Sequence, residues 1–146
     1  MEQIKHLLSV LATVEKHGDP ETAAWFRKGC NHYLTGKDRT SFDKALGFAS
    51  TRGKYTARTL FQRSERNRYI KNAFYCIDPD QGSTKRCELM AEAIRTFETR
   101  VYPRIKDLDA APADMSELRQ YLFMAKKTGA GLSTDWRTIY KWIYDI

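Results

Sequence analysis

Apolar residues recur every three to four positions along most of this chain, and no segment shows the strict alternation of a half-buried strand. The first run predicts a helix over about residues 2–17. It consists of Ile4, Leu7, Leu8, Leu11 and Val14. Asp19 followed by Pro20 is typical of an N-cap and a first helical residue, so a second helix is predicted over 20–35. These repeated helical runs predict an all-α fold of about six to seven helices.

Three further helices are predicted before residue 106. A short one contains Phe42, and a longer one starts near Thr56 and ends before Asp78. Polar residues interrupt the apolar stripe in the middle of this longer helix, so its central turn is expected to be exposed. Ser83 is the expected cap of the next helix, which Pro103 should end or kink.

Composition changes at residues 107–113, where acids, alanines and Pro112 replace the helical pattern. We interpret this stretch as a linker. The predicted organisation is a helical body over 1–106, followed over 107–146 by the linker and a C-terminal helical hairpin whose last helix is capped by Ser133. The two parts are expected to pack as one compact domain.

Length and composition predict a protein with a packed core. A chain of 146 residues with 42% hydrophobic residues is too apolar for intrinsic disorder. Three cysteines at irregular spacing do not form a disulfide framework. No signal peptide and no uncharged stretch of about 18 residues is found, so a cytoplasmic protein with reduced thiols and no membrane partner is expected.

Positive charge is concentrated in residues 51–75, which hold seven basic residues and one acidic residue, Glu65. The whole chain has 25 basic and 18 acidic residues, a net charge of +7, so the remainder is almost neutral. A local excess of this kind favours a polyanionic partner, and we predict that the segment contacts phosphates of DNA or RNA. The predicted phosphate ligands are Arg52, Lys54, Arg58, Arg63, Arg66, Arg68 and Lys71.

The C-terminal segment AKKTGAGLSTDWRTIYKWI resembles the end of a helix-turn-helix of the kind found in recombinases and repressors. Ala125, Gly129 and Ser133 follow the order alanine, glycine four residues later, capping serine. The matching second-helix residues are Thr138, Ile139, Tyr140, Lys141 and Trp142. The stretch between Gly129 and Ile139 is about four residues longer than in that motif.

The resemblance implies that Arg137 and Lys141 on the last helix contact nucleic acid, as a second set of binding residues. In the alternative interpretation this helix simply closes the core. Trp136, Ile139 and Ile143 would then be its core residues.

A second function class also fits the charge pattern. In this interpretation the protein is a non-enzymatic interaction module, an adaptor or inhibitor, whose basic helix docks an acidic protein. The expected exposed anchors are Trp25, Tyr33, Trp142 and Tyr144. In a third, purely structural interpretation, the arginines pair internally with acids at Glu88, Glu92, Glu98, Asp107 or Asp109.

Signals for catalysis are weak. The chain has no HExxH motif, no Cys-x-x-Cys motif and no glycine-rich phosphate loop. Cys30 and His32 point about 200° apart on a helix, which disfavours a shared metal ion. We therefore predict a small nucleic-acid-binding protein, such as a regulator, that is not an enzyme and uses no cofactor or metal.

Overall fold

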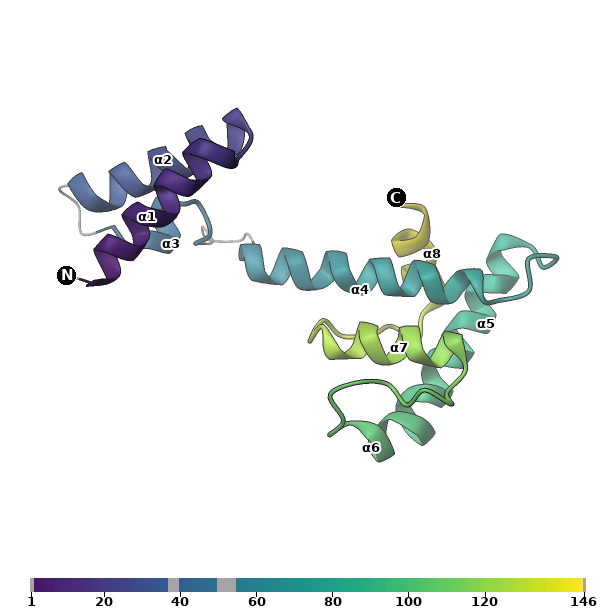
Figure 1. Cartoon of the computed structure of the whole chain (residues 1–146). Helices are drawn as coiled ribbons and strands as arrows, with labels where there is room; N and C mark the ends of the chain where they lie inside the picture. Colours follow the sequence, from purple (N-terminus) through teal and green to yellow (C-terminus); the bar gives the residue numbers. More distant parts are fainter. Residues whose placement is uncertain (1, 37–39, 50–54, 146) are drawn as a thin grey trace. The chain divides into compact units, whose positions relative to one another are not determined.

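The computed structural model describes residues 2–36, 40–49 and 55–145, and all regular elements in these ranges are helical (Figure 1). The predicted all-α fold is confirmed. Six helices in the described ranges have nine or more residues: α1 (Glu2–His17), α2 (Pro20–Thr35), α4 (Ala57–Tyr75), α5 (Ser83–Thr96), α7 (Glu117–Lys127) and α8 (Trp136–Tyr144). The shorter elements are α3 (Phe42–Ala45), a π turn (Phe97–Val101) and α6 (Tyr102–Ile105).

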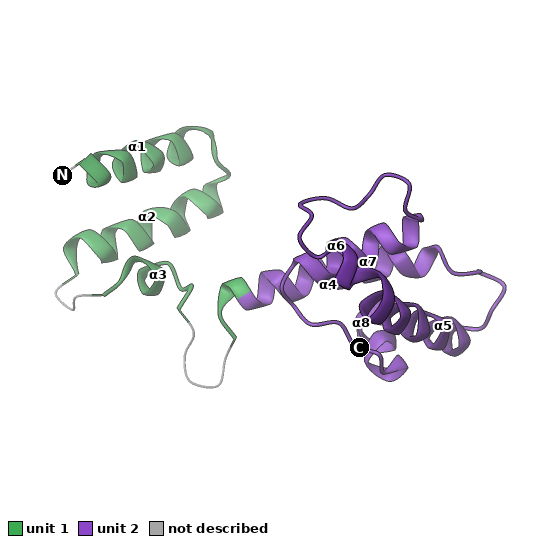
Figure 2. Cartoon of the chain, turned by 90° about the horizontal axis from the view of Figure 1, so that it is seen from below, with its two compact units in different colours: residues 1–58 green, residues 59–146 purple. Residues whose placement is uncertain are grey.

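The chain divides into two compact units, which Figure 2 colours separately. The N-terminal unit comprises residues 1–58 and the C-terminal unit residues 59–146. The division falls in the first turn of α4. It therefore lies well before the predicted linker, and α7 and α8 belong to the same unit as α4 and α5.

In the N-terminal unit, α1 and α2 form a hairpin and α3 packs against α2. The predicted cap between the first two helices is present: the Asp19 carboxylate accepts a hydrogen bond from the backbone N–H of Thr22 at 2.9 Å. Gly29 allows α3 to approach, since a Cβ at this position would lie 2.3 Å from Leu46 Cδ2. The buried hydrophobic residues found in this unit are Ala23, Cys30 and Leu46.

The C-terminal unit has a larger core to which each of its long helices contributes. Ile70 and Phe74 of α4 are buried together with Met90 and Ile94 of α5 and with Ile139 of α8. The other fully buried side chains of this cluster include Phe97, Leu122 and Phe123. This core fixes α4, α7 and α8 relative to one another, and these helices carry the candidate site.

An arginine satisfies the C-terminal end of α4. Arg86 of α5 donates to the carbonyl oxygen of Phe74, in the last turn of α4, at 2.9 Å, and to that of Ile77, just beyond the helix, at 3.3 Å. The predicted cap of α5 is wrong. Gly82 occupies the N-cap position, and Ser83 is the first helical residue.

Pro103 interrupts the regular α-helical hydrogen bonding, as expected for a residue without a backbone N–H. The helix widens into the π turn just before it, where the N–H of Tyr102 donates to the carbonyl of Phe97, five residues earlier. Pro103 has no N–H to offer to the carbonyl of Thr99, and its ring crowds that carbonyl. The chain then continues as α6, with Pro103 at its second position.

Candidate nucleic-acid interface

The predicted phosphate ligands do not form a single cluster. Arg52 and Lys54 lie outside the described residues. Arg58 is exposed in the first turn of α4, at the end of the N-terminal unit. The other four residues of the set lie on the part of α4 that belongs to the C-terminal unit, and each has a different environment.

Arg66 is buried, with 8% of its surface exposed, so the prediction of an exposed central turn is wrong at this residue. Its guanidinium carbon lies 3.7 Å from the centroid of the Trp142 ring, and its Nη1 donates to the carbonyl of Gly131 at 3.0 Å. Nε and Nη2 both donate to Asn67 Oδ1. Burial lowers the pKa of this guanidinium, and the charge of Arg63 adds to the effect. Arg66 therefore joins α4 to α8 and to the loop before it.

The same contact corrects a second expectation. Trp142 was expected to be an exposed anchor, but its side chain is half-buried beneath Arg66 and packs against the core. Trp25, Tyr33 and Tyr144 are exposed as expected.

Arg68 and Lys71 remain at the surface in ion pairs. Arg68 donates through Nη2 and Nε to Glu65, at 2.7 and 3.1 Å, and these hydrogen bonds raise the pKa of its guanidinium. Lys71 Nζ lies 2.5 Å from Asp145 Oδ2, just after the end of α8. Neither acid is among those expected to neutralise the segment. Of those, Glu88, Glu92 and Glu98 pair instead with Lys85, Arg95 and Lys126.

One flank of α4 faces α8 and carries two of these cations. Arg63, Asn67 and Lys71 are spaced four residues apart, so they share a flank of the helix. The contact of Lys71 with Asp145 places this flank beside the end of α8. Arg63 is half-buried on it. The α4 side of the surface beside α8 therefore carries Arg63 and Lys71, the second of which is paired with Asp145.

The hairpin of α7 and α8 keeps some features of the motif it resembles. Ala125 and Ile139 are fully buried, and Gly129 adopts a left-handed conformation with φ of 81°. The connection over residues 128–135 is longer than the three- to four-residue turn of that motif. Its Gly131 carbonyl is the acceptor for Arg66, so α4 supports this longer loop.

Asp135, and not Ser133, caps α8, so the predicted cap is wrong. Its carboxylate accepts from the backbone N–H groups of Arg137 and Thr138 and from the Thr138 hydroxyl, at 3.4, 3.1 and 2.8 Å. The hydrogen bonds from Thr138 lower the pKa of this carboxyl. The acid therefore has a structural role at the start of the helix.

The outer face of α8 carries cations beside aromatic rings. Trp136, Arg137, Tyr140 and Lys141 line a surface hollow. The Arg137 guanidinium lies 4.7 Å from the centroid of the Trp136 ring, and the Tyr140 and Tyr144 rings are 4.5 Å apart. Arg137 and Lys141 are exposed and make no ion pair with any other residue that the structure describes. The inner face packs on the core through Ile139, so the helix both closes the core and presents two cations.

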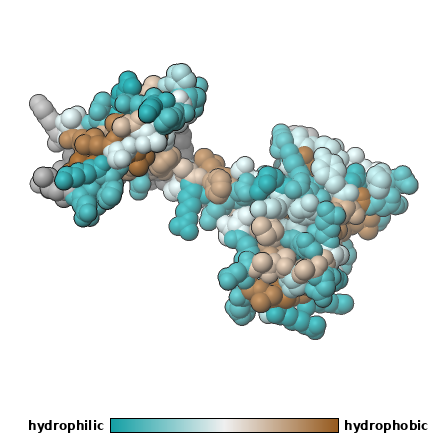
Figure 3. Space-filling model, viewed as in Figure 1, coloured by the Kyte–Doolittle hydropathy of each residue, from teal (hydrophilic) through white to brown (hydrophobic). Residues whose placement is uncertain are grey.

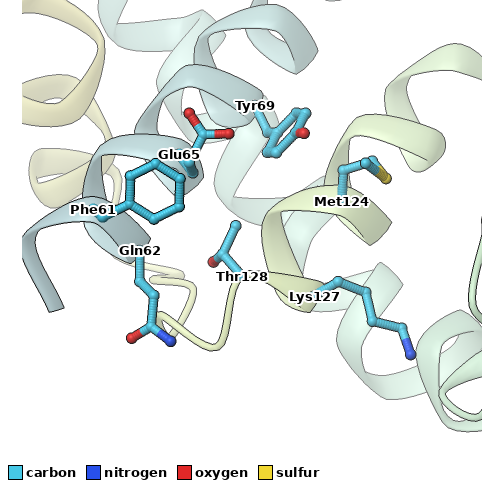
Figure 4. A pocket seen from close by; sticks show the side chains of 7 residues that line it. All are labelled: Phe61, Gln62, Glu65, Tyr69, Met124, Lys127 and Thr128. Carbon is cyan, nitrogen blue, oxygen red and sulfur yellow. The ribbon is translucent and has the colours of Figure 1, made fainter. Parts of the chain in front are cut away.

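A second hollow lies between α4 and α7 and was not anticipated from the sequence (Figure 4). Phe61, Glu65 and Tyr69 line it from α4, together with Met124 and Lys127 from α7. Gln62 and Thr128 complete its lining. Phe61 is a large aromatic residue, yet 66% of its surface is exposed. No local signal reveals this hollow, because it exists only where the two helices meet.

Among the described residues, no group of three or more His, Cys, Asp or Glu side chains is arranged to hold a metal ion. The three cysteines are unpaired thiols, and no helix in the described ranges has the length and hydropathy needed to cross a membrane. Comparison with known proteins yields no matching family model, no matching curated protein and no matching solved structure.

Proposed function

We propose that the C-terminal unit binds nucleic acid, with Arg137 and Lys141 of α8 as its main phosphate contacts. The observation that supports this proposal is the exposed pair itself. The two cations lie one helical turn apart on the same face, and neither forms an ion pair with a carboxylate among the described residues. An exposed pair of this kind contacts a polyanion without first breaking an ion pair.

The proposal narrows the predicted set of ligands. Arg66 is excluded, because its guanidinium is buried and its donors are used within the fold. Arg68 and Lys71 are retained as secondary contacts, since exposed ion pairs contribute little and exchange readily for a phosphate. Arg63 lies on the flank beside α8 and joins them. Arg52, Lys54 and Arg58 stay predictions outside this site.

The test is fluorescence anisotropy of labelled oligonucleotides titrated with the full-length protein at several salt concentrations. Replacing both Arg137 and Lys141 with Ala is expected to weaken binding and to reduce the slope of log affinity against log salt by about two, one unit for each lost contact. The matched control replaces Arg100 and Arg104, two exposed arginines that are also four residues apart. Equal losses in the two double variants, or binding insensitive to salt, would contradict the proposal.

A protein-interaction module is the second candidate, and exposed aromatic residues on α4 favour it. Phe61 and Tyr75 are 66% and 75% exposed, and Phe61 borders the hollow between α4 and α7. Large aromatic side chains dominate binding hot spots. Replacing Phe61 with Ala should then abolish capture of a protein partner and leave oligonucleotide binding unchanged. Capture that survives this change would exclude the hollow as the docking site.

A further inference from the structure

We infer that the hollow on α8 receives an unpaired nucleobase, so that the nucleic acid recognised by this protein is single-stranded at the site. The inference rests on the proposed function and concerns the two aromatic rings that lie beside the phosphate contacts in the same hollow. The phosphate contacts are the cations Arg137 and Lys141, whereas the base contacts are the rings of Trp136 and Tyr140.

The lining of the hollow fits an aromatic base that is linked to a negatively charged phosphate. Two of its four residues are aromatic and two are cationic, and none is acidic. Trp136 and Tyr140 are half-buried, so each ring is held by the core and still reaches the surface. Rings fixed in this way accept a base without first having to be ordered, and stacking on them tolerates any base sequence.

The acids at the two ends of α8 are already engaged. Asp135 is the cap of the helix, and its oxygens accept hydrogen bonds from Arg137 and Thr138. Asp145 forms the ion pair with Lys71. The ion pair with Lys71 therefore reduces the electrostatic repulsion of a strand at the C-terminal end of α8, whereas Asp135 keeps its negative charge at the start of the helix.

A duplex would use only half of this site. Its phosphates can contact Arg137 and Lys141, but its bases are stacked inside the double helix and cannot stack on the two rings of the hollow. An unpaired base supplies the ring and its own phosphate supplies the charge. A free nucleotide has the same chemistry, so the experiment must separate it from a strand.

The experiment measures the affinity of the full-length protein for four labelled or competing ligands at one salt concentration. They are a single strand, the same strand with abasic sites in place of its bases, the matching duplex, and a free nucleoside monophosphate. The single strand is expected to bind roughly 5- to 150-fold more tightly than the abasic strand, the range that one stacked base provides. The duplex should resemble the abasic strand, and the monophosphate should not compete at comparable concentrations.

Two variants of Tyr140 assign the effect to the ring. Tyr140→Leu keeps an apolar side chain and removes the ring, and it should weaken binding of the single strand without changing binding of the abasic strand. Tyr140→Phe keeps the ring and should bind like the unchanged protein. Because the abasic comparison uses the unchanged protein, it tests the inference even if Tyr140→Leu fails to fold.

The outcomes separate the two proposals. Equal binding of single strand, abasic strand and duplex would overturn the inference and leave phosphate binding intact. Effective competition by the monophosphate would also overturn it, since the site would then be a nucleotide site. Absence of binding to every ligand at low salt would overturn the proposed function together with the inference.

Discussion

Helices α1 and α7 are both amphipathic, yet they are buried very differently. In α7, Leu122, Phe123 and Ala125 are fully buried. In α1 no residue is buried, and Ile4 and Leu8 are 45% and 47% exposed. Figure 3 shows hydrophobic side chains gathered at the surface of the N-terminal unit, over the hairpin of α1 and α2. An apolar stripe therefore reveals that a helix has a face to bury but not how much of that face its neighbours cover.

The difference follows from the number of elements in each unit. The C-terminal unit surrounds its core with α4, α5, α7 and α8, whereas the N-terminal unit has one hairpin and the four-residue α3. A domain of about 60 residues buries only about 60% of the surface that its unfolded chain exposes. The N-terminal unit is accordingly expected to be the less stable of the two.

The largest effect is expected when one apolar side chain of each helix is shortened to alanine. Phe123→Ala removes a fully buried ring and should lower the free energy of unfolding of the C-terminal unit by about 3–5 kcal/mol. Leu8→Ala, on the half-exposed face of α1, should cost about 1 kcal/mol or less. Urea denaturation followed by circular dichroism measures both. A comparable loss for Leu8→Ala would show that the face of α1 is covered in solution.

Arg66 is a charged residue buried in the C-terminal unit, so its removal tests how much a polar contact adds to the stability of that unit. Arg66→Ala removes a cation–π contact and a charge-assisted hydrogen bond, and it should lower the free energy of unfolding by about 2–4 kcal/mol. Arg66→Lys should recover only part of this loss, since an ammonium cannot reproduce the planar stack on Trp142. Denaturation of the two variants beside Arg104→Ala, an exposed control, measures the effect. A neutral Arg66→Ala would contradict the structural role.

The loop before α8 tests whether the backbone conformation of a connection contributes to the stability of the C-terminal unit. Gly129→Ala places a side chain in a left-handed conformation and should cost about 1–2 kcal/mol. Gly131→Ala is the matched control in the same loop, because a Cβ there meets no atom within 4 Å. Thermal unfolding of the two variants gives the difference. Equal melting temperatures would indicate that the loop relaxes at no cost.

The smallest effect concerns the exposed cap of α8. Because the folded pKa of Asp135 is lowered, its contribution to stability is present above the ordinary pKa of aspartate, about 3.9, and is lost as the pH falls through the folded pKa. Asp135→Asn keeps a capping oxygen but does not titrate. The difference in melting temperature between the two proteins should therefore shrink as the pH is lowered from 5 to about 3. A difference that does not change with pH would exclude this carboxylate as the titrating group.

Local signals predicted the helices well. The predicted ranges 2–17 and 20–35 agree with α1 and α2, and the cap at Asp19 is confirmed. The break at Pro103 was also predicted, because the missing N–H acts within one turn of the chain. The predicted serine caps were wrong. Ser83 is the first residue of α5, after the N-cap Gly82, and α8 is capped by Asp135, two residues after Ser133.

The sequence alone determined that the chain is helical and where most of its helices begin and end, because propensity, capping and proline act over a few neighbouring residues. It also determined that positive charge is concentrated in residues 51–75. Only the tertiary structure decided what those charges do. Arg66 lies over Trp142 and bonds to Gly131, 65 residues away along the chain, and such a pairing depends on how α4 and α8 pack against a common core. The same packing leaves Arg137 and Lys141 exposed beside the rings of Trp136 and Tyr140.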